Sequence, residues 1–365
     1  NLTGIERVEL HLINYYIENT DAHFVVWNLS LRRWLKLRDD KIRRVVQDYN
    51  GNSSKNIGKT GIRIVEFGKI LLGKLKRLKD YQKVSIQNND KLIVPAGVWD
   101  NNDYIEGLLA LAKKKVKIVH VIHDMIPIVE PELVLGFMPR IFRHYMTQVL
   151  PVCNLLVAVS KASAADTRKF LEESKKKIPE IKTFRLGDDM LVSPSKTALI
   201  NERAPFCLMV GTFEIRKNHM LLYYVYKNAA RKGIKLPNLV IAGKKGWLTD
   251  SVYHLFMKDL EIKDKIIMTG AISDRELARL YEKAIYTIVP SLYEGWGLQV
   301  TESLARGTIV LASNISSLPE VGGDSCDYFS PYSPDELLEL MKKYNSIKNR
   351  ILKEAEIKDK YKRNE

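Results

Sequence analysis

The segment SLYEGWGLQVTESLARGTIVLASN, residues 291–314, decides the fold of the second half of the chain. An apolar strand ends at the start of this segment, and a glycine-bounded turn follows at 295–297. A helix that carries Glu302 then leads to a second apolar strand. This order predicts a parallel βαβ unit, because parallel strands need a crossover connection. Glycine permits the tight turn, and the free N–H groups at the start of a helix suit an oxyanion such as phosphate.

The rest of the second half repeats the same pattern. Ser273 with Glu276 three residues later predicts a capping box at a helix start, and Gly307 predicts the end of the helix that begins near 298. Short apolar runs predict strands at 205–212, 238–243, 265–270, 286–291 and 308–313, with helices at 219 onward, 273–284 and 298–307.

The first half shows a similar alternation. Helical spacing covers 4–19 and 161–174, and apolar runs predict strands at 23–29, 90–99, 115–127 (ended by Pro127) and 154–160. The fold class is therefore α/β, with two Rossmann-like halves whose parallel sheets face each other across a cleft, where ligands would bind. We expect an N-terminal Rossmann-like domain at 1–190, a linker at 191–204, a C-terminal Rossmann-like domain at 205–345, and a charged helix at 346–365 that crosses back to the first domain.

Bulk composition is that of a globular protein: 365 residues, 45% hydrophobic, with no apolar run near the roughly 20 residues that span a bilayer. Cys153, Cys207 and Cys326 are too few and too scattered for a disulfide framework or a zinc site, and they favour a reducing compartment, the cytosol. The chain opens at NLTGIERV, where a first strand would be expected to precede the loop, so a trimmed start is expected.

Two glutamates in the opening segment are candidates for chemistry. Glu294 follows a strand at the edge expected to face the cleft, and Glu302 lies in the second helical turn past Gly297. A carboxylate can accept two hydrogen bonds from a sugar or ribose diol. The alternative is a plain strand-to-helix turn with two solvated glutamates.

The chain resembles the retaining, GT-B-fold glycosyltransferases of family 4, whose signature is E-x7-E. The resemblance is carried in the second half by VGTFEIRKN (210–218), LVIAGKKGW (239–247), TGAISDRELARLYEKA (269–284), residues 289–324 around Glu294, and DYFSPYSPDEL (327–337). In the first half it is similar to bacterial polysaccharide mannosyl- and rhamnosyltransferases at TGIERV (3–8), WDNNDY (99–104), VIHDMIP (121–127) and VAVSKASAADT (157–167).

The resemblance implies that the domain at 1–190 binds the acceptor and that the domain at 205–345 binds the nucleotide sugar. It also implies a role for each matching residue. Glu294 would bind hydroxyls of the donor sugar, Glu302 would hold the ribose, and Lys217 with Arg216 would neutralise the departing diphosphate, where charge grows at the transition state. His123 would lie near the reacting carbon. The implied catalytic residues are His123, Glu294, Lys217 and Arg216; the implied donor-binding residues are Gly4, Gly211, Thr212, Arg216, Lys217, Glu294, Gly295, Trp296, Gly297, Leu298 and Glu302; the implied acceptor residues are Asp124 and Trp99.

The chain departs from the family pattern at three places. Thr212 stands where many members carry arginine, and Arg216 would supply the missing charge; Gln299 stands where proline is common, which we expect to be harmless; and the N-terminal loop has one glycine, Gly4, instead of two. From the residues alone, Arg216 with Lys217 could equally be an exposed pair at a helix start, and His123 a strand-end histidine satisfied by backbone.

No metal or other cofactor is expected, because cationic side chains serve the diphosphate. Asp188 with Asp189 is the nearest approach to a DxD-type pair, and it falls beside the expected linker.

A net charge of +15 favours anionic partners or surfaces. Residues 69–83, with apolar Ile70, Leu71, Leu75 and Leu78 near one helical face, predict a basic amphipathic helix for an anionic membrane, and LRRWLKLR (31–38) adds tryptophan and cations. A core-packed helix with a solvated basic face is the alternative.

The sequence therefore favours an enzyme: a retaining hexosyltransferase that moves mannose or rhamnose, with GDP-mannose the favoured donor, to a glycan or lipid-linked acceptor in surface polysaccharide synthesis. It would act in the cytoplasm, at the inner face of the cell membrane. The alternatives are a nucleotide-sugar 2-epimerase-like GT-B enzyme and a non-catalytic basic module for membrane or nucleic acid. No recognised nucleic-acid motif is present.

Overall fold

The computed structural model describes residues 4–20, 22–28, 30–38, 64–66, 81–188, 193–202 and 204–362. The chain folds into two compact units. The N-terminal unit comprises Leu2–Val129 and Gly136–Phe184, and the C-terminal unit comprises Glu130–Leu135 and Arg185–Glu365. The domain and linker boundaries expected from the sequence stay predictions.

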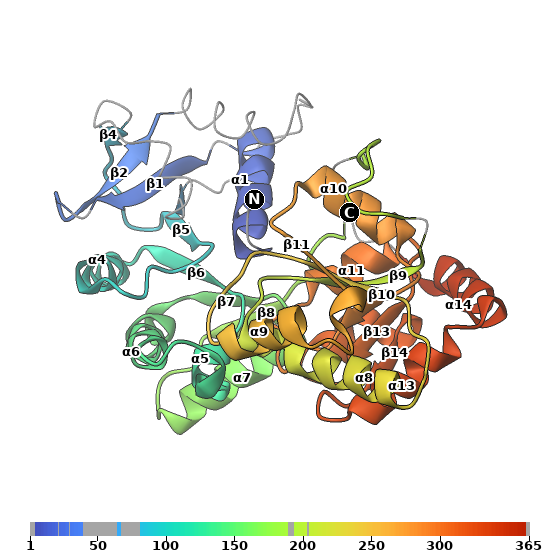
Figure 1. Cartoon of the computed structure of the whole chain (residues 1–365). Helices are drawn as coiled ribbons and strands as arrows, with labels where there is room; N and C mark the ends of the chain where they lie inside the picture. The colour runs from blue at the N-terminus through green and yellow to red at the C-terminus, as the bar shows by residue number, and fades with distance from the viewer. Residues whose placement is uncertain are drawn as a thin grey trace. The chain divides into compact units, whose positions relative to one another are not determined.

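The N-terminal unit is built on an eight-stranded sheet in the order β4-β2-β1-β3-β5-β6-β7-β8 (Figure 1). Strands β1, β3, β5, β6, β7 and β8 pair in parallel, whereas β2 pairs antiparallel with both β1 and β4. Its elements are α1 Gly4–Asn19, β1 His23–Asn28, β2 Arg33–Leu37, β3 Ile64–Glu66, β4 Tyr81–Lys83, β5 Lys91–Val94, α4 Asn102–Lys113, β6 Lys117–Ile122, α5 Ile126–Val129, α6 Met138–Val149, β7 Leu155–Ala158, α7 Lys161–Glu173 and β8 Glu180–Thr183.

The C-terminal unit holds a six-stranded sheet in the order β11-β10-β9-β12-β13-β14, and all its pairs are parallel (Figure 1). The predicted α/β class with parallel sheets is thus confirmed, with an antiparallel edge on the first sheet. The elements are β9 Phe206–Val210, α8 His219–Arg231, β10 Asn238–Ala242, α9 Asp250–Lys258, β11 Ile266–Gly270, α10 Asp274–Lys283, β12 Thr287–Val289, α11 Leu298–Leu304, β13 Val310–Ser313, α12 Leu318–Gly322, β14 Asp327–Phe329, α13 Pro334–Lys343 and α14 Ile347–Lys360.

Local sequence signals explain several of these boundaries. The capping box predicted at Ser273 and Glu276 is present at the start of α10. Gly307 has a φ of +75°, two residues past the C-cap Ala305 of α11. The strand predicted over 115–127 ends earlier, at Ile122, and Pro127 lies inside the short helix α5, where its fixed φ suits a first helical turn.

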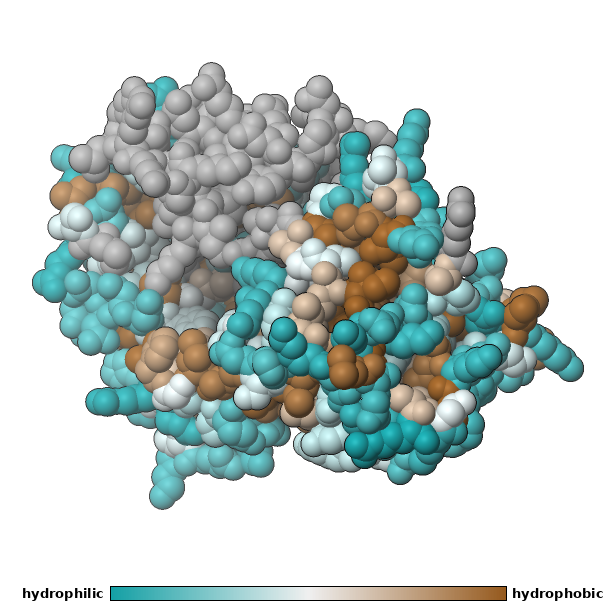
Figure 2. All heavy atoms as spheres, viewed as in Figure 1, coloured by the Kyte–Doolittle hydropathy of each residue, from teal (hydrophilic) through white to brown (hydrophobic). Residues whose placement is uncertain are grey.

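Buried hydrophobic side chains hold the helices against the sheets. In the C-terminal unit, Val240 and Ala242 of β10 pack with Leu280 and Tyr281 of α10. The described part of the expected linker also lies on α10, where Arg279 binds Glu202 through two hydrogen bonds of 2.7 and 2.6 Å. Figure 2 shows hydrophilic side chains over much of the visible face, with brown hydrophobic groups gathered between the positions of α10 and α8.

Candidate active site

The turn between β12 and α11 is held by glycine geometry and a serine. Gly297 has a φ of +105°, and a Cβ there would lie 2.6 Å from Leu318 Cδ2, so only glycine fits without strain. Ser317 Oγ donates to the carbonyls of Glu294 and Trp296, at 3.0 and 2.8 Å. These contacts fix the backbone that carries the Glu294 side chain.

The Glu294 carboxylate is the centre of a buried polar cluster; its side chain is 8% exposed. Its Oε1 accepts from Lys217 Nζ at 2.6 Å, from Ser291 Oγ at 2.6 Å and from Gln299 Nε2 at 3.0 Å. Its Oε2 accepts from Arg216 Nη1 at 2.7 Å. Three residues that the resemblance implied for the donor, Arg216, Lys217 and Glu294, therefore lie in direct contact.

The two cations reach Glu294 from the loop after β9. They lie in a short 3₁₀ turn, Ile215–Lys217, which ends at Asn218 with a left-handed φ of +56°. Asn218 Nδ2 donates to Pro290 O at 3.0 Å, and Leu292 N donates to Arg216 O at 2.8 Å. The loops that follow β9 and β12, 77 residues apart at Lys217 and Glu294, are thus joined by backbone as well as by charge. The alternative of an exposed pair does not hold for Lys217, which is 7% exposed.

Charge balance in this cluster is complete. Arg216 Nη2 donates to Glu214 Oε1 at 2.6 Å, so two cations face two carboxylates. Burial raises the pKa of Glu294, but Arg216 and Lys217 outweigh it and lower that pKa to about 2. Glu294 is therefore ionised at neutral pH.

Gly211 and Thr212 lie beside this cluster at the end of β9. A Cβ on Gly211, whose φ is +143°, would lie 3.0 Å from Lys217 Cε, so glycine leaves room for the lysine stem. Thr212 Cγ2 fills the space next to Gly246, where an added Cβ would come within 2.7 Å. Thr212 thus packs, and replacement of the missing arginine charge by Arg216 stays a prediction.

Glu302, the second glutamate of the signature, lies in different surroundings. It is 4% exposed on α11, and its Oε2 accepts from Tyr281 Oη of α10 at 2.8 Å. The predicted pair of carboxylates is thus divided between a cationic cluster and a tyrosine contact. The solvated-glutamate alternative fails for both residues.

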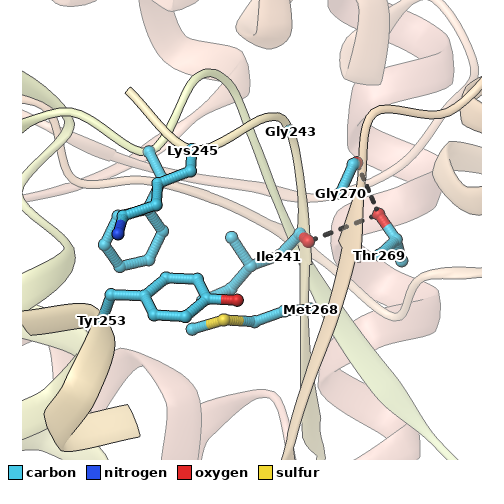
Figure 3. Close-up of a pocket in the computed structure, with 8 residues that line it drawn as sticks. Ile241, Gly243, Lys245, Tyr253, Met268, Thr269 and Gly270 are labelled. Atoms are coloured by element: carbon cyan, nitrogen blue, oxygen red, sulfur yellow. Dashed lines mark hydrogen bonds between the residues drawn. The ribbon is translucent and has the colours of Figure 1, made fainter. Parts of the chain in front are cut away.

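A pocket of about 360 Å³ opens among the ends of β9, β10 and β11 in the same unit (Figure 3). Aromatic and apolar side chains form its walls, and glycines leave its strand ends bare; Lys245 Nζ lies 5.2 Å from the centroid of the Tyr253 ring and pairs with Asp250. Figure 3 shows Met268 alongside Tyr253. Such walls suit a planar, partly apolar group. The lining residues are Phe213, Ile241, Gly243, Lys245, Tyr253, Met268, Thr269 and Gly270.

Four of the predicted residues belong to the N-terminal unit. His123 follows β6, its Nε2 lies 2.7 Å from Pro95 O, and burial lowers its pKa, so it is neutral and Nε2 carries the proton. Asp124 Oδ1 accepts from Ile126 N at 3.1 Å. Trp99 meets Phe142 edge to face at 5.0 Å. Gly4 is the first residue of α1, in a helix and not in an open loop.

His120, also on β6, is a core residue. It is 1% exposed, with Nε2 2.7 Å from Tyr145 Oη and Nδ1 2.8 Å from Val121 O. Burial lowers its pKa to about 4, so it is neutral near pH 7.

Sequence reasoning missed the residues that support the cluster: Ser291, Gln299, Glu214, Ser316, Ser317 and Tyr281. Ser316 and Ser317 follow β13, so the β-strand order of a doubly wound sheet was the signal that could have placed them next to the turn after β12.

The predicted basic helix at 69–83 lies outside the described residues over 69–80, and its last three residues are wrong: Tyr81–Lys83 form strand β4. In LRRWLKLR, residues Arg33–Leu37 form strand β2, and Trp34 is 7% exposed against Trp27 and Tyr104. Trp34 therefore belongs to the core and not to a membrane face. Within the described ranges, every helix is too short or too polar to cross a membrane.

Among the described residues no group of three or more His, Cys, Asp or Glu side chains could hold a metal ion. Asp188 accepts hydrogen bonds from Arg185 and from Tyr361 Oη, at 3.1 and 2.8 Å, while Asp189 is outside the described residues.

Comparison with known proteins finds similarity to glycosyltransferases. Residues 195–363 match the family model for "Glycosyl transferases group 1". Escherichia coli serotype-specific mannosyltransferase WbdA is 27% identical over 241 residues, which is 62% of this chain and 29% of that protein. Escherichia coli O-antigen chain mannosyltransferase B is 27% identical over 191 residues, 51% of this chain and 50% of that one.

The fold similarity extends over both units. The structure of Anabaena HepE in complex with UDP and glucose has a TM-score of 0.61 and 14% identity, and the match covers 98% of this chain and 92% of that one. The chain therefore has the GT-B fold, and nearly half of it, residues 195–363, is similar to the group 1 glycosyltransferases, family GT4. It spans well under two thirds of the length of the mannosyltransferases named above.

Proposed function

We propose that the protein is a retaining hexosyltransferase that takes its sugar from a nucleoside diphosphate donor, with mannose favoured over rhamnose. The observation that carries this proposal is the Glu294 carboxylate held between Lys217 and Arg216 at 2.6 and 2.7 Å. A sugar diphosphate needs cations for its leaving group and a carboxylate for its hydroxyls, and this cluster supplies both in a buried site.

In this proposal the acceptor hydroxyl attacks the anomeric carbon as its bond to the diphosphate oxygen breaks on the same face. The leaving phosphate oxygen takes the acceptor's proton. Lys217 and Arg216 stabilise the negative charge that grows on the diphosphate. This stabilisation is larger in the transition state than in the ground state, so it accelerates the reaction. The donor is also contacted by Glu302, by Gly4 and by the backbone of Gly295, Gly297 and Leu298. His123 lies by the reacting carbon, and the acceptor lies by Asp124 and Trp99.

The donor's base would occupy the pocket lined by Phe213, Tyr253 and Met268. Its volume of about 360 Å³, its aromatic walls and its bare glycine edges suit a nucleobase. Mannose is favoured because two curated relatives, WbdA and O-antigen chain mannosyltransferase B, carry that sugar in their names. The O-antigen chain in the name of the second relative supports a glycan acceptor.

The expected place of action is the cytoplasm, at the inner face of the cell membrane. Cys153, Cys207 and Cys326 are buried and unpaired, as suits a reducing compartment. A lipid-linked acceptor would bring the enzyme to that membrane. Contact of residues 69–83 with the anionic membrane surface stays part of the proposal.

A donor screen by thermal shift tests the proposal. GDP-mannose, dTDP-rhamnose, UDP-glucose and UDP-N-acetylglucosamine would each be added to the parent, to Glu302→Ala, and to Glu261→Ala as a surface control for the same change. We expect one donor to raise the melting temperature of the parent and the control but not of Glu302→Ala. Release of free nucleotide without an acceptor would support the epimerase-like alternative, and no shift with any donor at millimolar concentration would overturn the proposal.

A further inference from the structure

Gln299 is the second residue of α11 and is 8% exposed. Its Nε2 donates to Glu294 Oε1 at 3.0 Å. A carboxylate oxygen only accepts hydrogen bonds, so the amide nitrogen must face Glu294 and the amide oxygen must face away from it. No residue in the described part of the chain donates a hydrogen bond to that oxygen. Gln299 is therefore an oriented amide with a vacant acceptor.

Acceptor capacity remains on both residues of the contact between Gln299 and Glu294. Glu294 Oε1 already accepts from Lys217, Ser291 and Gln299, whereas Glu294 Oε2 accepts from Arg216. A hydroxyl that enters the cluster can thus be accepted by Glu294 Oε2 or by Gln299 Oε1, but Oε1 of Glu294 is saturated.

We propose that Gln299 is a sugar-recognising residue, whose amide oxygen accepts a hydrogen bond from one hydroxyl of the donor sugar while Glu294 Oε2 accepts from its neighbour. The inference rests on the proposed function. It restricts the donor to hexoses in which two free hydroxyls, on adjacent carbons, reach this cluster. A proline at 299 could make neither contact.

The purely structural alternative is that Gln299 only helps to hold Glu294. The two roles differ in what they do to ligands. A sugar contact changes binding of the nucleotide sugar and leaves the nucleoside diphosphate untouched, since the diphosphate has no sugar hydroxyl to offer at this cluster. A role through Glu294 alone would alter the cations as well, and so affect both ligands.

The test compares GDP-mannose with GDP, and UDP-glucose with UDP, by calorimetric titration. Gln299→Met keeps the shape and removes both polar atoms; Gln299→Asn keeps a shortened amide; Gln148→Met, at an exposed site on α6, is the matched control. For Gln299→Met we expect the Kd of the nucleotide sugar to rise about tenfold and that of the nucleoside diphosphate to stay unchanged. For Gln299→Asn, the Kd of the nucleotide sugar should lie between those of the parent and Gln299→Met. This variant preserves the test if the methionine variant does not fold.

Equal weakening of both ligands, or no weakening of either, would overturn the inference while the proposed function stands. A parent protein that binds neither the nucleotide sugars nor the nucleoside diphosphates would overturn both.

Discussion

The C-terminal and N-terminal units hold their candidate residues in different ways. In the C-terminal unit Glu294, Lys217 and Arg216 bind one another through charged side chains. In the N-terminal unit His123 and Asp124 are held by backbone groups, Pro95 O and Ile126 N. The first arrangement depends on the chemical identity of every partner, whereas the second needs only that backbone groups lie in the right place. The effect of a substitution should therefore reach every member of the first cluster but stay local in the second.

Removal of Glu294 tests this difference most strongly. Glu294→Ala leaves Lys217 and Arg216 buried without their shared carboxylate, so the free energy of unfolding should fall by about 3 kcal/mol. Sugar transfer should fall about a thousandfold, because the cations lose their geometry at the leaving group. Urea unfolding and donor consumption measure the two effects. Glu261→Ala should change neither, and a fully active Glu294→Ala variant would refute the assigned site.

Acid should weaken the N-terminal unit through His120. Its pKa is lowered to about 4 in the fold from an ordinary 6.5, so between those values the unfolded chain binds a proton that the folded chain does not. The free energy of unfolding should fall by about 3 kcal/mol as the pH drops from 6.5 to 4. His120→Gln, which can still bond Tyr145, should flatten urea-unfolding stability over that window.

The exposed His144 is the matched control: His144→Gln should leave the slope of stability against pH as in the parent. An unchanged slope in His120→Gln would show that His120 is not the acid-sensitive group of its unit.

His123→Ala should act locally. We expect kcat to fall by about tenfold to a hundredfold, because a group near the reacting carbon is lost, while the Kd of the nucleoside diphosphate stays the same. Steady-state kinetics with a separate titration of the diphosphate distinguish these quantities. Weaker binding of the diphosphate would mean that His123 serves the donor's phosphates instead.

The smallest expected effect concerns the contact of Tyr281 with Glu302. Tyr281→Phe removes the hydrogen bond of 2.8 Å, so nucleotide affinity should drop by up to about tenfold. Tyr286→Phe is a close control, since the buried Tyr286 hydroxyl has no hydrogen-bond partner among the described residues. Titration with the nucleoside diphosphate should leave Tyr286→Phe indistinguishable from the parent; if both variants weaken alike, Tyr281 has no special role.

Much of the C-terminal unit was predictable because most of its strands are short, apolar and buried on both faces. The runs around Phe206, Val240 and Leu311 all form strands, and the capping box at Ser273 marks a helix start without ambiguity. Less of the N-terminal unit was predictable. The cations of Arg33–Leu37 suggested a membrane surface, but tertiary pairing of β2 with β1 buries Trp34.

The site was predictable only in part. The resemblance implied Glu294, Lys217 and Arg216, and the structure brings them together. Their mutual neutralisation, and the support from Ser291 and Gln299, depend on distances between loops far apart in the sequence, which no local pattern encodes. Gln299 stands where proline is common in the family, and its hydrogen bond to Glu294 was not predicted from the sequence; that the replacement is harmless stays a prediction.

The internal carboxylate has a consequence for product release. In the proposed transferase a spent nucleoside diphosphate competes with Glu294 for Lys217 and Arg216, since the carboxylate can pair with both cations again as soon as the phosphates withdraw. A site with permanently unpaired cations would retain its product and be inhibited by it. The ion pairs seen here therefore favour fast turnover at high nucleotide concentration.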